Sequence, residues 1–210
     1  MTVIEILMTR LDVGSAAARE AATLLSDEER LRAASFSRPR DSRRFIVARA
    51  ELRRQLGARL NVSAQEIEFA RGPHGKPCLA GRNTHALHFS VSHSDDVAAL
   101  AFATGGEIGV DIEVLRPVPD AETIAAQLCS PEEWRAYASL TEHQKLRGFL
   151  DWWTRSEAVV KAHGGGLGHP LDTSGVAWTV RTFDPGPGLV GAVAFATGCE
   201  TGAETRVTHG

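Results

Sequence analysis

The chain has 210 residues, of which 43% are apolar and 23% charged, and its formal net charge is −3 at pH 7. This length and apolar content allow one domain or two small ones around a buried core. The mild negative charge excludes a strongly basic nucleic-acid-binding protein. No stretch approaches the roughly 18 apolar residues of a membrane-spanning helix, and residues 1–10 lack a secretory signal pattern, so no membrane partner is expected.

The cysteines indicate a reducing compartment. Disulfide-stabilised secreted domains usually carry an even number of cysteines at regular spacings. Here there are three, far apart in the sequence and without a C-x-x-C motif: Cys78, Cys129 and Cys199. A cytoplasmic location is therefore expected.

The first sixty residues predict a strand followed by helices. Val3 to Met8 is a short apolar run typical of a strand, and the alanine-rich composition from Ser15 favours a helix. Ser26-Asp27-Glu28-Glu29 is a capping box that starts a second helix. From Asp41 to Leu60, apolar residues near helical spacing predict a longer, arginine-rich helix.

The middle of the chain predicts short strands. Apolar runs in this region are separated by Gly, Asn, Asp and Ser, which mark turns. The predicted strands are 67–69, 87–91, 97–103 and 108–114.

The remaining chain predicts helices and then strands again. Ser130-Pro131-Glu132-Glu133 opens a capped helix, and Gln144 to Ala162 forms a long one. Val176 to Thr182 and Leu189 to Ala196 return to the strand pattern. The last dozen residues are polar enough to be a frayed tail.

An internal repeat relates the two halves. Residues 97–109 align with residues 190–202, and most of the aligned positions are identical. The two capping boxes add a second correspondence. Duplication predicts an α+β fold with pseudo-twofold symmetry, made of two similar helix-plus-sheet subdomains over residues 1–107 and 108–210. A ligand site is expected between them, since sites are common at such interfaces.

Two acidic residues lie on a strand that otherwise belongs to the core. In Gly109-Val110-Asp111-Ile112-Glu113, Asp111 and Glu113 are two residues apart and therefore share a face. Desolvating two neighbouring carboxylates costs several kcal/mol each unless a cation compensates. A hard divalent cation such as Mg²⁺ would do so. A strand that leaves the core at Glu113 would give the same pattern, with the carboxylate solvated.

A second acidic position lies on the predicted helix 144–162. Glu157 and Lys161 are four residues apart and share a helical face. Alone, such a pair is ordinary surface decoration. Here Trp152 and Trp153 precede the pair by one turn, and a glycine run from Gly164 ends the helix. An acid and a base held between aromatic residues and a tight turn are typical of a functional site.

These motifs resemble those of the 4′-phosphopantetheinyl transferases of the surfactin-synthetase-activating type. The resemblance rests on residues 109–113 and on the pattern Trp-x-x-x-Glu-Ala-x-x-Lys-x-x-Gly-x-Gly-Leu over residues 153–167. Gly75-Lys76-Pro77 and residues 89–94, Phe-Ser-Val-Ser-His-Ser, occur in the family order. The resemblance spans about Ile4 to Phe195, and it implies a pseudo-dimeric fold with coenzyme A between the lobes.

The resemblance also implies the chemistry. Members transfer 4′-phosphopantetheine from coenzyme A to a serine of an acyl or peptidyl carrier protein and release adenosine 3′,5′-bisphosphate. Matching positions would make Asp111, Glu113 and Glu157 the carboxylates for Mg²⁺, with Mn²⁺ as an alternative. Glu157 would also accept the proton of the carrier serine, and Lys161 would stabilise charge on the leaving phosphate.

Other matched residues are expected to contact coenzyme A. The hydroxyl of Ser92 and the imidazole of His93 would meet its phosphates, and Lys76 in the turn fixed by Pro77 would supply a cation. A lone histidine beside serines is otherwise an ordinary turn feature, and the G-x-S-x-G motif of a nucleophilic hydrolase is absent from the sequence. The candidates for the 3′-phosphate, chosen for their planar guanidinium groups, are Arg32, Arg44 and Arg49.

One position departs from the family pattern. Ser156 stands directly before Glu157, where the family usually has lysine, and this puts an auxiliary role of that lysine in doubt. Two other function classes remain open from the sequence: a non-catalytic module that binds coenzyme A or a carrier domain, and a Mg²⁺-dependent hydrolase of nucleotide pyrophosphates. A monomer is expected, since a duplicated chain has less need of a second subunit to complete its site.

Overall fold

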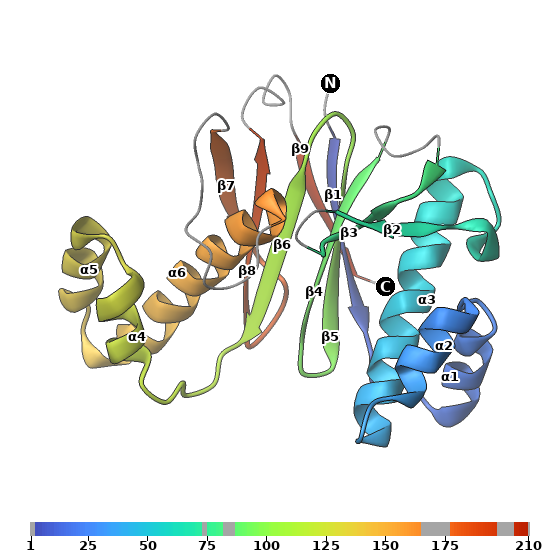
Figure 1. Cartoon of the computed structure of the whole chain (residues 1–210). Coiled ribbons are helices and arrows are strands. Elements are labelled where there is room, and N and C mark those ends of the chain that lie inside the picture. Colours follow the sequence, from blue (N-terminus) through green and yellow to red (C-terminus); the bar gives the residue numbers. More distant parts are fainter. Residues whose placement is uncertain (1–2, 73–74, 82–86, 165–176, 197–203, 210) are drawn as a thin grey trace.

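The computed structural model describes residues 3–72, 75–81, 87–164, 177–196 and 204–209. The fold is α+β, with helices at both ends of the molecule and strands between them (Figure 1). Four predicted features lie outside the described residues: the glycines after Gly164, Val176, the repeat segment 197–202 and Cys199.

The N-terminal half begins with a strand, continues through three helices and ends in a β-hairpin. The predicted strand 97–103 is confirmed to the residue. The elements are β1 (Val3–Arg10), α1 (Ser15–Ala22), α2 (Asp27–Ala34), α3 (Pro39–Leu60), the short 3₁₀ helix η1 (Ala64–Glu66), β2 (Phe69–Arg71), β3 (Pro77–Leu79), β4 (His88–Ser94) and β5 (Val97–Ala103).

The C-terminal half repeats this succession. The predicted strands 108–114 and 189–196 are confirmed to the residue. The elements are β6 (Ile108–Val114), α4 (Ala121–Leu128), α5 (Pro131–Ala138), α6 (Glu142–His163), β7 (Trp178–Phe183), β8 (Leu189–Ala196) and β9 (Glu204–His209). The sequence analysis did not predict α4.

The helix starts follow from their capping residues. The capping boxes at Ser26 and Ser130 are both formed, with each serine hydroxyl accepting the N–H of the glutamate three residues on. The helix α3 begins two residues before the predicted Asp41, because Pro39 is preorganised for the first helical turn. The helix α6 begins at Glu142, before the predicted Gln144, because Thr141 and Gln144 form a further capping box.

The two halves have the same strand order. One sheet has the order β4-β5-β1-β9 and another β6-β8-β7, so the antiparallel triplets β4-β5-β1 and β7-β8-β6 correspond. A helix of 22 residues, α3 in one half and α6 in the other, precedes each hairpin. The N-terminal half also contains a small pair, β2-β3.

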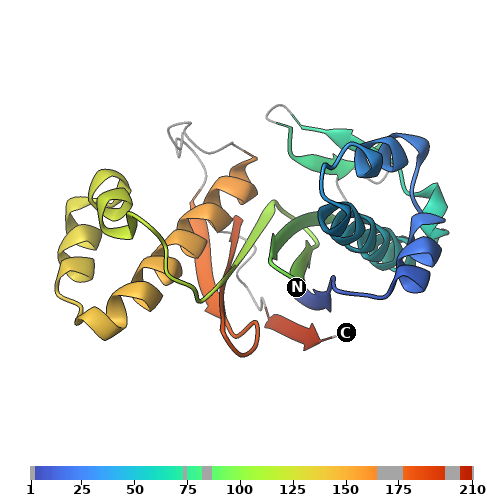
Figure 2. The same cartoon turned by 90° about the horizontal axis from the view of Figure 1, so that it is seen from below.

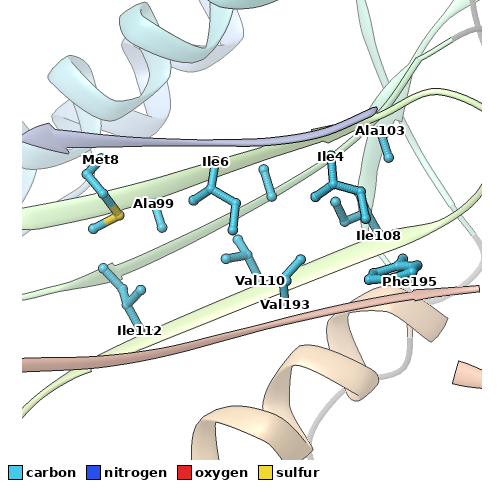
Figure 3. Packing of buried hydrophobic residues seen from close by; sticks show 11 residues of the cluster. Ile4, Ile6, Met8, Ala99, Ala103, Ile108, Val110, Ile112, Val193 and Phe195 are labelled. Carbon is cyan, nitrogen blue, oxygen red and sulfur yellow. The ribbon is translucent and has the colours of Figure 1, made fainter. Parts of the chain in front are cut away.

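The molecule has the layers helix, sheet, sheet, helix (Figure 2). Alternate residues of β1 and β5 point inward and meet alternate residues of β6 and β8 in the central cluster shown in Figure 3. The outward residues of β5, such as Leu100 and Phe102, pack with Leu52 and Leu56 of α3. Ala158 and Ala162 of α6 pack with Ala192 and Ala194 of β8 in the outer layer of the second half.

The prediction of a frayed C-terminal tail was wrong. The strand β9 pairs in parallel with β1 and forms the edge of the N-terminal sheet. Its composition is polar because an edge strand needs only limited contact with the core, here supplied by Val207. Among the described residues, no helix is both long and apolar enough to cross a membrane.

Candidate functional site

Asp111 and Glu113 lie on the face of β6 that is turned toward α6. The alternate residues Ile108, Val110 and Ile112 point into the central core, so the two carboxylates share the opposite face, as the period of a strand predicts. The helix α6, which carries Glu157 and Lys161, lies against β6. The fold therefore brings the acidic residues of β6 together with the motif residues of α6.

Asp111 is the deepest charged group of this site. It is only 4% exposed, and its Oδ1 atom lies 2.6 Å from Lys161 Nζ. Ser92 donates a hydrogen bond to the same oxygen at 2.8 Å, and Lys161 also donates to Ser92 Oγ at 3.0 Å. The other oxygen, Oδ2, is buried and has no hydrogen-bond partner among the described residues. Burying a carboxylate oxygen without a partner costs free energy, and a cation bound to this oxygen would offset that cost.

The two glutamates surround Asp111 with further negative charge. Burial, and then the charge of Asp111, raise the pKa of Glu157 above its ordinary value. Burial is also the main reason for the raised pKa of Glu113, to which the charge of Asp111 adds, although a hydrogen bond from Ser94 opposes the rise. Ionising the two glutamates is therefore unfavourable until positive charge is added.

The donor set suits a hard divalent cation in its chemistry, since all three groups offer carboxylate oxygens. Among the described residues, however, no three His, Cys, Asp or Glu side chains are arranged to hold a metal ion. The ammonium of Lys161 takes the position beside Asp111 instead. A cation bound by this set would require the Lys161 ammonium to move away from Asp111.

A cleft of about 820 Å³ opens beside these residues, between the two halves. Glu113 and Lys161 line it from the C-terminal half. Ser92, also predicted to bind coenzyme A, is buried behind the cleft. The other six residues with that prediction line the cleft from the N-terminal half: Arg32, Arg44, Arg49, Lys76, Pro77 and His93.

The three arginines that line the cleft from the N-terminal half already have partners. Arg44 donates to Asp96 Oδ1 from Nε at 2.9 Å, and Arg49 Nε lies 3.5 Å from Glu29 Oε1. The guanidinium groups of Arg32 and Arg49 also stack on the ring of Phe45, at 5.5 and 5.7 Å from its centroid. These contacts hold the three cations on the N-terminal wall of the cleft.

His93 borders the cleft with an exposed ring. Partial burial of the imidazole, together with the positive charges of Lys161 and Arg44, lowers its pKa from the ordinary value. A neutral ring is therefore favoured until an anion enters beside it.

Comparison with known proteins assigns the family. The sequence model of the 4′-phosphopantetheinyl transferase superfamily matches residues 107–192, and the model of a 4′-phosphopantetheinyl transferase N-terminal domain matches residues 15–105. The 4′-phosphopantetheinyl transferase HetI of Nostoc sp. is 34% identical over 200 residues, which are 89% of this chain and 84% of that protein. The chain belongs to the 4′-phosphopantetheinyl transferase superfamily.

Other relatives of this transferase match over less of their length. A Synechocystis sp. protein is 36% identical over 71% of this chain, which is 61% of that protein. The human L-aminoadipate-semialdehyde dehydrogenase-phosphopantetheinyl transferase is 28% identical over 70% of this chain and half of its own length. The predicted family and the predicted class of activity, phosphopantetheine transfer to carrier proteins, are confirmed by these matches.

In this transferase Lys76 is less available than a free cation in a turn. Its Nζ atom lies 2.5 Å from Glu107 Oε2, and it donates to the backbone oxygens of Ile108 and Ala162 at 2.9 and 3.1 Å. The side chain therefore ties the turn before β3 to the start of β6 and the end of α6. Its predicted role at coenzyme A stays a prediction.

The Lys76 contact gives the transferase a pH-dependent contribution to stability. Partial burial would raise the pKa of Glu107, but hydrogen bonds from His88 and Lys76 outweigh it and lower the pKa from 4.5 to about 2. The folded pKa is depressed, so the contribution is complete above pH 4.5 and disappears as the pH falls toward 2. Because the Glu107 side chain is half exposed, we expect about 1 kcal/mol or less.

Chemical denaturation of the wild type and Glu107→Gln on either side of pH 4.5 measures this contribution. The difference in unfolding free energy between the two proteins should shrink as the pH falls from 4.5 toward 2. A difference that stayed constant with pH would show that Glu107 does not supply it.

The sequence analysis missed two parts of the site. Ser94 donates to Glu113 Oε2 at 2.8 Å and is buried. Arg116 lines the cleft and lies 3.2 Å from Asp95. The signal for Ser94 was present, because it alternates with Ser92 on the same strand and so shares its face. Ser156, which replaces the usual lysine, donates to the backbone oxygen of Trp152 at 3.1 Å.

Proposed function

We propose that this chain transfers 4′-phosphopantetheine from coenzyme A to a serine of an acyl or peptidyl carrier protein, in the cleft between its two halves. One observation carries the assignment of the site. The buried Asp111 carboxylate, with one oxygen unpartnered among the described residues, lies near two glutamates of raised pKa, and one of them, Glu113, lines a cleft bordered by arginines. Such a place suits a cation and a polyanionic substrate.

The metal would be held by Asp111, Glu113 and Glu157. Mg²⁺ is the expected ion, with Mn²⁺ as the alternative. When bound, it would neutralise charge on the pyrophosphate oxygens of coenzyme A. The family in general uses Mg²⁺ and coenzyme A, and the oxygen-only donor set supports the same choice here.

Residues of the chain would then perform the proton transfer and the charge stabilisation. The serine oxygen of the carrier forms a bond to the phosphorus that bears the pantetheine arm, and the bond to the bridging oxygen breaks. Adenosine 3′,5′-bisphosphate leaves with that electron pair. Glu157 accepts the serine proton, for which its raised pKa is favourable, and Lys161 stabilises the charge on the departing phosphate.

Coenzyme A would lie along the N-terminal wall of the cleft. Arg32, Arg44 and Arg49 on this wall support placing the 3′-phosphate of coenzyme A beside them, because guanidinium groups bind phosphate through two parallel hydrogen bonds. The phosphates nearer the metal would meet His93, and Ser92, which is buried behind the cleft, would hold Asp111. The turn of Lys76 and Pro77 would border the nucleotide. An incoming phosphate would raise the pKa of His93 again and so strengthen its own binding.

The finer architecture belongs to the same proposal. The matching strand orders of the two sheets support a pseudo-twofold duplication. The two family matches meet close to the proposed division into residues 1–107 and 108–210, although β9 returns to the first sheet. We also propose that the protein acts as a monomer in the cytoplasm, in keeping with Cys78 and Cys129, which are free thiols.

Product analysis tests this function against its alternatives. The protein is incubated with coenzyme A and Mg²⁺, with and without an apo carrier protein, and nucleotide products are separated by chromatography. A transferase releases adenosine 3′,5′-bisphosphate only when the carrier is present, and none with EDTA. Release of free phosphopantetheine without a carrier would identify a pyrophosphate hydrolase. Binding of coenzyme A without any product would leave a binding module.

A further inference from the structure

The two sheets meet along a junction that ordinary strand pairing does not close. The strands β4 and β6 are the neighbouring edges of their sheets, yet they belong to different hydrogen-bonded sheets. They run side by side in the middle of the molecule (Figure 1). The amide groups of β6 that point toward β4 therefore need acceptors other than a strand backbone.

Three alternate serines of β4 supply these acceptors. Ser90, Ser92 and Ser94 are all buried. Their hydroxyl oxygens accept hydrogen bonds from the backbone N–H groups of Val110, Ile112 and Val114, at 3.1, 3.4 and 3.1 Å. Both numbers in each pair rise by two from one bond to the next, so the strands are parallel and in a fixed register. We call these three residues the serine row.

Two members of the serine row also hold a carboxylate. Each serine accepts the N–H of one β6 residue, and it lies beside the β6 residue that comes just before that one in the sequence. For Ser92 that residue is Asp111, and for Ser94 it is Glu113, with hydrogen bonds of 2.8 Å in both cases. For Ser90 the corresponding residue is Gly109, which has no side chain.

A serine hydroxyl has one proton to donate and two lone pairs to accept with. In Ser94 the proton goes to Glu113 and a lone pair receives the N–H of Val114, so the backbone of β6 fixes the direction in which the hydroxyl points. A carboxylate held in this way loses rotamer freedom before any ligand arrives. Outer groups that orient metal ligands act through the same preorganisation.

We propose that Ser94 is a positioning residue for Glu113: the same hydroxyl that joins β4 to β6 also holds this carboxylate in one orientation. This inference rests on the proposed function of the cleft. It goes further by assigning a role to a residue that lines the cleft but is no metal ligand in that function. Ser90 serves as the matched control, because it closes the same junction without holding a carboxylate.

The test measures Mn²⁺ binding by electron paramagnetic resonance, with the protein alone and with the protein saturated with coenzyme A. Four proteins are compared with the wild type: Ser94→Ala, Ser90→Ala, Glu113→Gln, and the double variant Ser94→Ala/Glu113→Gln. Thermal unfolding of each protein reports the loss of the junction hydrogen bond separately. Ser94→Ala and Ser90→Ala should lower Tm to a similar extent, since each removes one acceptor from a β6 amide.

The Mn²⁺ affinity should then separate the two serines. Ser94→Ala should weaken binding by about 10-fold or more, whereas Ser90→Ala should remain within about twofold of the wild type. In the Glu113→Gln background, Ser94→Ala should add no further loss, because its effect passes through Glu113. Equal affinities in Ser94→Ala and Ser90→Ala would overturn the positioning role while leaving the proposed function intact. A wild type that binds no Mn²⁺ in either state would overturn the metal site itself, and the positioning role with it.

Discussion

The Glu157→Gln variant is expected to lose about 100-fold or more of the transfer rate while it keeps or exceeds the wild-type Tm. Glutamine preserves the shape of the side chain but can neither accept the serine proton nor offer a charged oxygen to a metal. The stability follows from the raised pKa of Glu157, which burial and the charge of Asp111 cause. A raised folded pKa means that ionisation opposes folding at neutral pH, so removing the charge relieves the folded state.

Two measurements check this expectation on the same sample. Initial rates of carrier modification give the loss of activity, and calorimetry gives Tm. Glu51, on the partly exposed surface of α3, provides a matched control, and Glu51→Gln should leave the rate near the wild-type value. Wild-type rates in Glu157→Gln would contradict the role assigned to that carboxylate. A large drop in Tm would contradict the account of its raised pKa.

The Gly109→Ala variant is expected to be the most destabilising single-methyl change at the site. A Cβ atom at position 109 would lie 2.0 Å from the backbone oxygen of Ala158 and 2.3 Å from the backbone nitrogen of Ala162. Both contacts are helix backbone, so α6 as a whole must move away from β6. We expect a loss of about 3 kcal/mol or more, which lowers Tm by roughly 6–12 °C in a chain of this size. Transfer should fall as well, because α6 carries Glu157 and Lys161.

A second glycine provides the control for this prediction. At Gly14 an added Cβ would meet nothing within 4 Å, and the backbone φ of −61° suits any residue. Gly14→Ala should therefore change the free energy of unfolding by no more than about 1 kcal/mol. If Gly109→Ala unfolded at the same temperature as Gly14→Ala, the close packing of β6 against α6 would not be needed for stability.

The parts of the fold that were predicted correctly are those that local sequence determines. The strands 97–103 and 189–196 are continuous apolar runs, and in 108–114 apolar residues recur at every second position. Ser26 and Ser130 mark helix starts through their own capping bonds. The strand β9 was missed because its pairing with β1 is a long-range contact that its polar composition does not reveal. The candidate site was predicted mainly from the set of family motifs, because no single residue pattern in the chain was specific enough to predict it.

The contacts within the site could not be read from spacing. The spacing of Glu157 and Lys161 predicted only that they share a helical face, and it did not reveal that the Lys161 ammonium lies against Asp111 on the facing strand. A buried carboxylate attracts the nearest cation more strongly than a half-exposed one does, since less water screens it. The bonds from Ser92 and Ser94 depend on how two sheets meet, and residues 19 positions apart in the sequence carry no local signal of that contact.

The most direct test of the central claim is the intact mass of an apo carrier protein after incubation with this protein, coenzyme A and Mg²⁺. Carriers from fatty-acid, polyketide and peptide synthases should be tried in parallel, each with an EDTA control and with Glu157→Gln in place of the wild type. We predict that at least one carrier gains the mass of one phosphopantetheine, and that EDTA and Glu157→Gln both abolish the gain. Unchanged masses for every carrier, with coenzyme A still bound by the protein, would contradict the assignment as a transferase.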